Sequence, residues 1–286
     1  MKLTALMDFY EKKYGLEEGL SRVKKQGYEA VVYTLPRHED YMKYQWTEDE
    51  FRNYFTNIGK TIKESGLSVA FTTTGTGLYN DCVPDSYENR VDMCIKGVRA
   101  SAYMGSEVFL VRPVKYFRGH EDGVELSKQL TYDALKRIYA EAERQSVRLA
   151  IVNSGSDYIY GWNVEELAEL SNEFDMDIVI DPAEAFHAGC KLNQLVRFLG
   201  DRVVGVFMRD TLVDLYDTAM PFMGRTDYLR MVNVLKDLPK ESALVTVQNL
   251  NYMKYQDFLD SEELVKALDE LYFTIGSVVS GKGSIS

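Results

Sequence analysis

The sequence predicts an α/β protein folded as one closed barrel, and three observations lead to that expectation. Short apolar segments with strand character alternate roughly eight times with amphipathic segments along the 286 residues. No segment between them has the composition of a linker, and α/β barrels commonly take about 250 residues as one unit. No glycine-rich phosphate loop follows the first strand, which argues against an open dinucleotide-binding sheet. We therefore expect a single (β/α)8 TIM barrel over residues 1–276 and a small polar tail that frays at 277–286.

The elements of the first half follow from periodicity and from the residues that interrupt it. Four short apolar runs predict strands, at 2–8, 30–35, 67–73 and 107–112. Amphipathic patterns predict the helices between them, at 16–27, 47–66 and 86–105. The second helix opens with a capping box, in which Thr47 and Glu50 each bond the backbone of the other.

The second half continues the alternation. Strands are predicted at 147–153, 178–181, 203–209 and 243–248. Helices are predicted at 127–145, 163–174, 192–199, 227–238 and 261–271. The strand that ends at Asp181 is a continuous β-branched run, followed by Pro182 and a small polar turn carrying Glu184 and His187. A carboxylate at the carboxyl end of a barrel strand lies where such folds keep their functional groups, so Asp181 is the first candidate residue.

Charge and composition exclude several classes of protein. The net charge of −11 argues against a nucleic-acid partner, which requires clustered Lys and Arg. The apolar run after Met1 is too short for a signal peptide, and no segment is long enough to span a membrane. The three cysteines have no metal-binding or disulfide spacing. We expect a cytoplasmic protein that binds neither nucleic acid nor membrane.

Six segments carry a resemblance to a known family. They are GLEEGLSRVKKQGYEAVVYTL, RASAYMGSEVFLV, SVRLAIVNSG, DIVIDPAEAFHAG, VVGVFMRDT and MGRTDYLRMVNVLKDL. In their order and spacing they resemble the xylose-isomerase-like barrels of sugar and sugar-phosphate isomerases and epimerases. The resemblance implies a divalent metal held by Glu, Asp, His and Glu at the ends of strands five to eight. It also implies that the two glutamates move a proton next to a carbonyl that the metal polarises.

Only one of those ligands is matched in this sequence. Asp181 stands at the aspartate position, whereas the first glutamate falls at Val152 and the last at Gln248. The histidine three residues after the aspartate falls at Glu184, and the strand-seven histidine falls at Phe207. We therefore expect no metal site of the family type, no cofactor and no proton transfer between two glutamates. The three histidines of the chain also argue against the zinc-rich endonuclease branch.

Polar residues nevertheless remain at the predicted strand ends: Arg112, Asn153, Asp181, Glu184, Arg209, Asp210 and Gln248. One interpretation is a ligand site, in which Asp181 and Glu184 are the acid–base pair. Arg112 and Arg209 would then orient an anionic group, and Asn153 and Gln248 would bind hydroxyls. The other interpretation is an internal salt-bridge network in a site that has lost its function. In both, Asp181 needs Arg112 or Arg209 as its counter-charge, and Asp210 is better explained as structural.

Two repeated motifs fall in the predicted loops. YMKYQ occurs at 41–45 and at 252–256, where its tyrosines would stack on a sugar and Lys43 and Lys254 would meet an anion. Chance repetition in a chain with 20 tyrosines is the alternative. HED at 38–40 and 120–122 offers ligands for an improvised metal site, or simply charged loops. We expect His187 to have a packing role and Asp227 to cap a helix.

Two functions remain open. The first, from the resemblance, is an isomerase-like or epimerase-like protein with a degenerate metal site, acting on a sugar or sugar phosphate at the carboxyl-terminal mouth. The second is a non-catalytic carbohydrate-binding or regulatory protein on the same fold. A homodimer is expected only by analogy with other barrels of the family.

Overall fold

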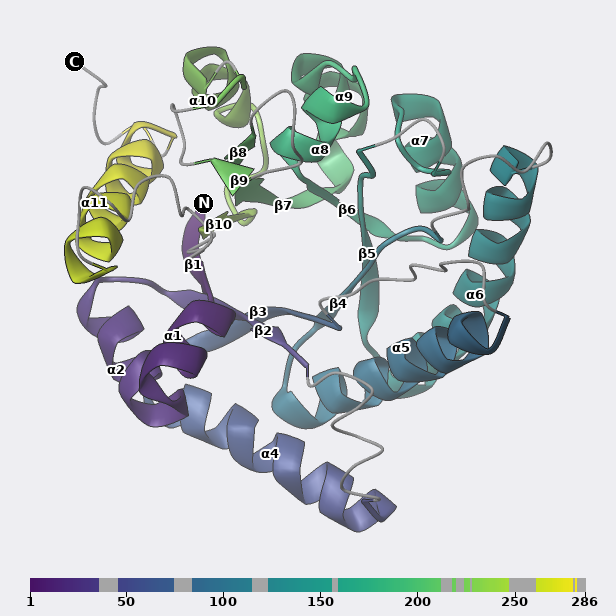
Figure 1. Ribbon diagram of the computed structural model, residues 1–286, viewed down its shortest axis with the longest axis horizontal. Coiled ribbons are helices and arrows are strands. Elements are labelled where there is room, and N and C mark those ends of the chain that lie inside the picture. Colours follow the sequence, from purple (N-terminus) through teal and green to yellow (C-terminus); the bar gives the residue numbers. More distant parts are fainter. Residues whose placement is uncertain are drawn as a thin grey trace.

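The computed structural model describes residues 1–35, 46–74, 84–114, 123–155, 159–211, 218–219, 224–226, 228–246, 261–279 and 281. Within these residues eight strands form a closed barrel, and every pairing in it is parallel. Successive strands are neighbours, and the last strand pairs with the first (Figure 1). The predicted (β/α)8 barrel is therefore confirmed.

The barrel strands lie where the apolar runs predicted them. They are β1 (Lys2–Leu6), β2 (Ala30–Thr34), β3 (Ser68–Thr73), β4 (Val108–Val111), β5 (Arg148–Val152), β6 (Asp177–Ile180), β7 (Val203–Met208) and β10 (Ala243–Thr246). Their observed ends differ from the predicted ends by no more than two residues. Most of the difference is at the carboxyl ends, because polar residues such as Arg112 and Asp181 lie just beyond the hydrogen-bonded strand.

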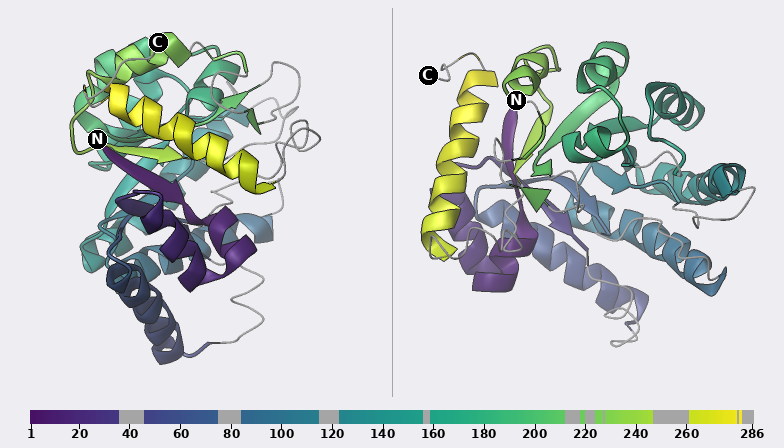
Figure 2. Two further views of the ribbon diagram at one scale, coloured as in Figure 1. Left: turned by 90° about the vertical axis from the view of Figure 1, so that its left-hand side faces the viewer. Right: turned by 45° about the horizontal axis from the view of Figure 1, so that its top comes forward.

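Helices surround the barrel on all sides, as Figures 1 and 2 show. The predicted ones are α2 (Leu16–Lys25), α4 (Glu48–Glu64), α5 (Pro84–Met104), α6 (Gly123–Gln145), α7 (Val164–Glu173), α9 (Leu192–Leu199), α10 (Tyr228–Leu235) and α11 (Ser261–Val279). The capping box of α4 is confirmed. The Glu50 carboxylate accepts from the Thr47 N–H at 2.8 Å, and the Thr47 hydroxyl accepts from the Glu50 N–H at 3.3 Å. No helix among the described residues is long and apolar enough to cross a membrane.

Two short helices were not predicted. Helix α1 (Met7–Tyr14) begins inside the segment predicted as the first strand, and Gly15, with φ of +78°, separates it from α2. Helix α8 (Pro182–His187) replaces the predicted polar turn after Asp181. Pro182 occupies the first helical position, where its missing N–H costs no hydrogen bond. Glu184 therefore lies on a helix and not in a loop.

Two further differences concern the second half of the chain. Helix α11 continues past residue 271 to Val279, and Val278 and Val279 are buried. The first residues of the predicted polar tail are therefore helical, because apolar surface is available to cover them. A short antiparallel pair, β8 (Asp210–Thr211) and β9 (Thr218–Ala219), follows β7 and was also not predicted.

The apolar core has an inner layer, which fills the barrel, and an outer layer between the strands and the helices. Val152, Val179 and Phe207 belong to the inner layer. Successive residues of a strand point to opposite faces, so a residue two positions later points toward the axis again. Asp181 and Arg209 stand two positions after Val179 and Phe207. Both are thus directed into the carboxyl-terminal mouth, above an apolar floor.

Candidate functional site

The carboxyl ends of three strands bring four charged side chains together. Arg112 follows β4, Asp181 follows β6 and Arg209 follows β7, while Glu184 lies in the first turn of α8. Ion-pair contacts link the four groups. Asp181 is the residue through which Arg112 and Arg209 are connected. We define these four residues as the mouth cluster.

Asp181 holds the centre of the cluster. Its side chain is 1% exposed, and its two carboxylate oxygens accept from Arg209 Nε at 3.0 and 2.8 Å. Arg209 makes a second contact with Oδ2, in which Nη2 lies 2.8 Å from that oxygen. The Oδ1 atom also accepts from the backbone N–H of Ala183 at 3.1 Å and of Glu184 at 3.4 Å, so Asp181 is the N-cap of α8. The carboxylate is fully engaged, and its buried charge is compensated.

Arg209 bridges the two carboxylates. Its Nη2 donates to Glu184 Oε1 at 2.7 Å, while its Nε donates to the Asp181 carboxylate. Burial disfavours the charged guanidinium, but the carboxylates of Asp181 and Glu184 outweigh burial and raise the pKa of Arg209 above its ordinary value. Arg209 is therefore a permanent positive charge. Asp181 has the counter-charge that the sequence predicted, and of the two arginines proposed it is Arg209 that makes the close contact.

Asn153, at the end of β5, ties the cluster to the neighbouring strand. Its Oδ1 accepts from the Asp181 N–H at 2.6 Å, and its Nδ2 donates to the Asp181 carbonyl at 3.1 Å. The side chain is fully buried. Asn153 was predicted to bind a ligand hydroxyl, but its amide is engaged with the Asp181 main chain. Its geometry is that of a residue that positions Asp181.

Glu184 reaches the mouth through a gap left by a glycine. Its side chain is 21% exposed, with Oε1 on Arg209 and Oε2 turned toward Gly155. A Cβ at position 155 would overlap Oε2, so glycine is required for this approach. Arg112, Val152, Gly155 and Glu184 line a small cleft of about 20 Å³, which has room for one water-sized group.

Arg112 is the least engaged member of the mouth cluster. Its side chain is 24% exposed, and its Nη2 lies 3.9 Å from Asp181 Oδ2, too far for a hydrogen bond. It lines the cleft beside Glu184. The Arg112 guanidinium is therefore partly exposed at the mouth, with no hydrogen bond to Asp181.

The remaining predicted residues divide into those with structural contacts and those that are not described. Asp210 is fully buried, and its carboxylate accepts from the N–H groups of Thr211 and Thr226 at 2.8 and 2.9 Å and of Gly224 at 2.9 Å. Its predicted structural role is confirmed. The His187 ring lies 2.6 Å from the Thr211 hydroxyl. The other residues lie outside the described part of the chain, namely Lys43, Asp227, Gln248, Lys254, both YMKYQ segments and both HED segments.

The described residues at this mouth do not fit a divalent metal. No group of three or more His, Cys, Asp or Glu residues in the described part of the chain is arranged to hold one. Asp181 and Glu184 share a guanidinium, and Val152 and Phe207 contribute only apolar surface to the inner layer. Apolar residues thus stand at two of the family's ligand positions, and at the same mouth an arginine contacts the two carboxylates.

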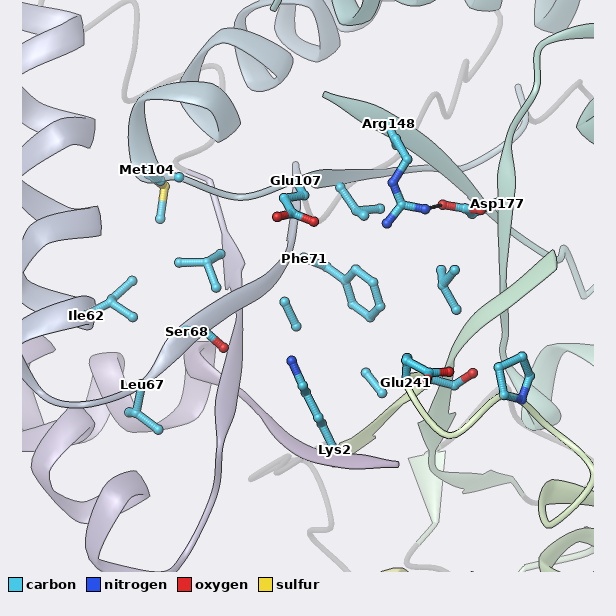
Figure 3. A pocket seen from close by; sticks show the side chains of 18 of the residues that line it. Lys2, Ile62, Leu67, Ser68, Phe71, Met104, Glu107, Arg148, Asp177 and Glu241 are labelled. Carbon is cyan, nitrogen blue, oxygen red and sulfur yellow. Dashed lines mark hydrogen bonds and ion pairs between the residues drawn. The ribbon is translucent and has the colours of Figure 1, made fainter. Parts of the chain in front are cut away.

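A cavity of about 730 Å³ lies at the opposite, amino-terminal mouth. Figure 3 shows charged side chains from the starts of several strands around it, with Lys2 and Arg148 reaching inward. Arg148 pairs with Asp177, and burial raises the pKa of the Asp177 carboxyl while Arg148 partly lowers it. None of the site residues predicted from the sequence lines this cavity. Because functional groups of barrel enzymes lie at the other mouth, the mouth cluster remains the candidate site.

The model of the family described as xylose isomerase-like TIM barrel matches residues 20–271. The chain belongs to this family. No curated protein sequence matches the chain.

Members of this fold with known structures resemble the chain over nearly their whole length. The Escherichia coli 3-keto-D-glucoside 4-epimerase YcjR has a TM-score of 0.70 at 14% identity, covering 97% of this chain and 99% of its own. The IOLI protein with a bound zinc atom has a TM-score of 0.72 at 15% identity, covering both chains fully. The D-psicose 3-epimerase of Clostridium cellulolyticum H10, solved with D-tagatose, has a TM-score of 0.68 at 10% identity, covering 99% and 100%. Identities this low show a shared fold.

Proposed function

We propose that this protein binds a small sugar or sugar derivative at its carboxyl-terminal mouth and acts on it as an isomerase-like enzyme. The observation that carries the proposal is the placement of the accessible Arg112 guanidinium beside the partly exposed Glu184 carboxylate, above an apolar floor. The family, and the sugar epimerases among the structural neighbours, support a sugar as the ligand class.

Glu184 is the group that would move a proton. A base must reach the ligand, and Asp181 is 1% exposed with both oxygens accepting hydrogen bonds, whereas Glu184 is 21% exposed. We therefore keep Glu184 as the acid–base residue and assign Asp181 to positioning Arg209 and α8.

The proposed reaction uses one base on one face of the sugar. The Glu184 carboxylate removes the proton from the carbon next to the carbonyl, and the electron pair moves onto the carbonyl oxygen to give an enediolate. The guanidinium groups of Arg112 and Arg209 stabilise that negative charge. The hydroxyl proton of the neighbouring carbon passes to the oxygen that carries the negative charge, and Glu184 returns the first proton to the former carbonyl carbon from the same face. The C=O bond has then moved to the neighbouring carbon, which interconverts an aldose and a ketose. Inverting a single carbon would instead need a second acid on the opposite face of the sugar.

Arg112 would also select the ligand. Guanidinium groups bind carboxylates and phosphates through paired N–H donors, so a sugar acid or sugar phosphate suits this position better than a neutral sugar. Replacing Arg112 by Met should lower the affinity for such a ligand at least tenfold while leaving the free energy of unfolding unchanged. Arg148→Met, at the opposite mouth, is the matched control and should leave affinity unchanged.

Two measurements test the proposal. Thermal shift with a panel of aldoses, ketoses and their phosphates identifies a ligand, and nuclear magnetic resonance in D2O then follows solvent deuterium entering it. We expect deuterium at the carbon next to the carbonyl, and loss of this exchange in Glu184→Gln. If no sugar of the panel raises the melting temperature, or if Arg112→Met binds as tightly as the natural protein, this placement of the site is wrong.

A non-catalytic sugar-binding protein is the second candidate function. It is favoured by the engagement of Asp181 and by the apolar residues Val152 and Phe207 at the mouth. The same experiment separates the two functions, because a binding protein would take up the sugar without deuterium exchange.

A further inference from the structure

We propose that the guanidinium of Arg209 takes the place of the divalent metal, so that the mouth cluster carries a built-in cation and does not bind a metal ion. The inference concerns the same mouth as the proposed function. It rests on the ion contacts among the described residues, and no sugar has to be identified to test it.

First, Arg209 occupies the two carboxylates that could otherwise serve as metal ligands. Arg209 donates to both oxygens of Asp181 and to one oxygen of Glu184, at distances between 2.7 and 3.0 Å. A planar guanidinium matches this arrangement because its donors spread in a fork. A metal ion binding the same oxygens would have to displace Arg209.

The second step is the charge of the cluster. Asp181 and Glu184 contribute two negative charges, and Arg209 and Arg112 contribute two positive ones, so the four groups sum to zero. A divalent ion would add two positive charges beside two buried or half-buried guanidinium groups. Electrostatic repulsion in this sheltered position therefore opposes metal binding.

The third step is the rigidity of the arrangement. Asn153 fixes the main chain of Asp181 with two hydrogen bonds, and Asp181 caps α8. On the other side, Asp210 is the residue immediately after Arg209, and its carboxylate accepts from three backbone N–H groups. Both ends of the Arg209–Asp181 contact are thus held by the fold, as is expected of a permanent cation site.

The fourth step is the access of the cation to the mouth. Arg209 is 17% exposed, so part of the side chain reaches the surface of the site while most of it is sheltered. A positive charge in a sheltered, preorganised position stabilises a negative oxygen more strongly than one in water. Arg209 can therefore supply the chemistry for which related barrels use a metal.

Metal titration without any sugar tests this directly. We would dialyse the natural protein against EDTA, and then titrate it with Mn²⁺ by calorimetry. We expect no binding with a Kd below 1 mM, and no change in melting temperature on adding EDTA or Mn²⁺. Mn²⁺ binding that is lost in Glu184→Gln would overturn the proposal, and this outcome requires no variant of Arg209.

The converse experiment exposes the carboxylates. Arg209→Met leaves Asp181 and Glu184 without their cation, so we expect this variant to bind Mn²⁺ at least tenfold more tightly than the natural protein. Arg209→Lys, which keeps the charge, should bind no more tightly than the natural protein. Arg148→Met, which removes the arginine partner of one carboxylate, Asp177, at the other mouth, is the control and should gain nothing. If Arg209→Met folds and gains no affinity, the guanidinium does not stand in a metal position.

The outcomes are independent of the proposed function. Failure to find a sugar ligand would leave the metal titrations valid. Strong Mn²⁺ binding by the natural protein would contradict the built-in cation without contradicting sugar binding.

Discussion

Strand β6 has an aspartate at each end, and each pairs with an arginine from a neighbouring strand. At the amino-terminal end, Asp177 pairs with Arg148, whose side chain is 56% exposed. Just past the carboxyl-terminal end, Asp181 is 1% exposed and pairs with Arg209, which is 17% exposed. The two pairs have the same chemistry, but Asp177 is 13% exposed and its arginine lies largely in water, whereas both partners of the second pair are sheltered.

The surroundings of the two aspartates differ as well. Asp181 accepts from two backbone N–H groups in addition to the arginine, and Asn153 holds its main chain. Asp177 instead borders the open cavity of the amino-terminal mouth (Figure 3). The pair at the carboxyl-terminal mouth is thus buried and held by main-chain hydrogen bonds, whereas the pair at the amino-terminal mouth joins a sheltered aspartate to an arginine that lies largely in water.

The largest effect is expected from removing Arg209. Arg209→Met leaves the buried Asp181 with only the distant Arg112 as a cation, so we expect a loss of about 3–5 kcal/mol in the free energy of unfolding. The matched variant Arg148→Met removes a largely exposed arginine from Asp177, which keeps the favourable charge of Arg202, and should cost about 1 kcal/mol or less. Urea denaturation at pH 7 measures both. Equal losses in the two variants would show that the two mouths do not differ in this way.

A smaller effect is expected from Asp210, which fixes the chain next to Arg209. In Asp210→Asn, a buried carboxylate that accepts from three N–H groups becomes a neutral amide with one oxygen. We expect a loss of about 1.5–3 kcal/mol, because hydrogen bonds to a charged acceptor are lost. Asp201→Asn, at the exposed rim of the other mouth, should change the unfolding free energy by less than about 0.5 kcal/mol. If Asp210→Asn leaves the free energy of unfolding unchanged, other contacts hold Arg209 in place.

Gly155→Ala tests the packing of Glu184. The added methyl group would overlap the Glu184 carboxylate, so that side chain must turn away from Arg209. We expect a loss of about 1 kcal/mol, at the low end for overpacking, because the end of the flexible Glu184 side chain can turn aside and chiefly its contact with Arg209 is lost. The control is Gly200→Ala, because position 200 has a helical backbone and no atoms within 4 Å of the new Cβ. This control should be neutral or stabilising by less than about 1 kcal/mol. If both substitutions are tolerated, Glu184 does not depend on the gap at Gly155.

The fold could be predicted closely because strands buried on both faces leave continuous apolar runs in the sequence. The six residues of α8 are too few to show a helical period, so the segment was taken for a turn. An Asp followed by a Pro at the first helical position was the signal that could have revealed the helix.

The candidate site was predicted only in part. Asp181, Arg112 and Arg209 could be named because each follows an apolar strand at the same mouth of the barrel, and the lone Asp181 carboxylate needed an arginine as its counter-charge. The role of Asn153 depends on the hydrogen bonds between the ends of β5 and β6, and the gap at Gly155 depends on the direction of Glu184. Neither leaves a periodic pattern, so neither could be read from the residues alone.

The smallest effect, and the one that distinguishes the two aspartates by pH, is expected at Asp177. Burial raises the pKa of its carboxyl above the ordinary value of 3.8, although Arg148 and Arg202 partly lower it. The folded protein then holds this proton more tightly than the unfolded chain, so its stability falls as the pH rises through 3.8 to the folded-state pKa. Asn does not titrate. Asp177→Asn should therefore gain stability relative to the natural protein between pH 3 and pH 6, by less than about 1 kcal/mol. Urea denaturation at the two pH values measures this difference. A relative loss over the same interval would mean that the ion pair with Arg148 outweighs burial, and that the amino-terminal mouth resembles the carboxyl-terminal one.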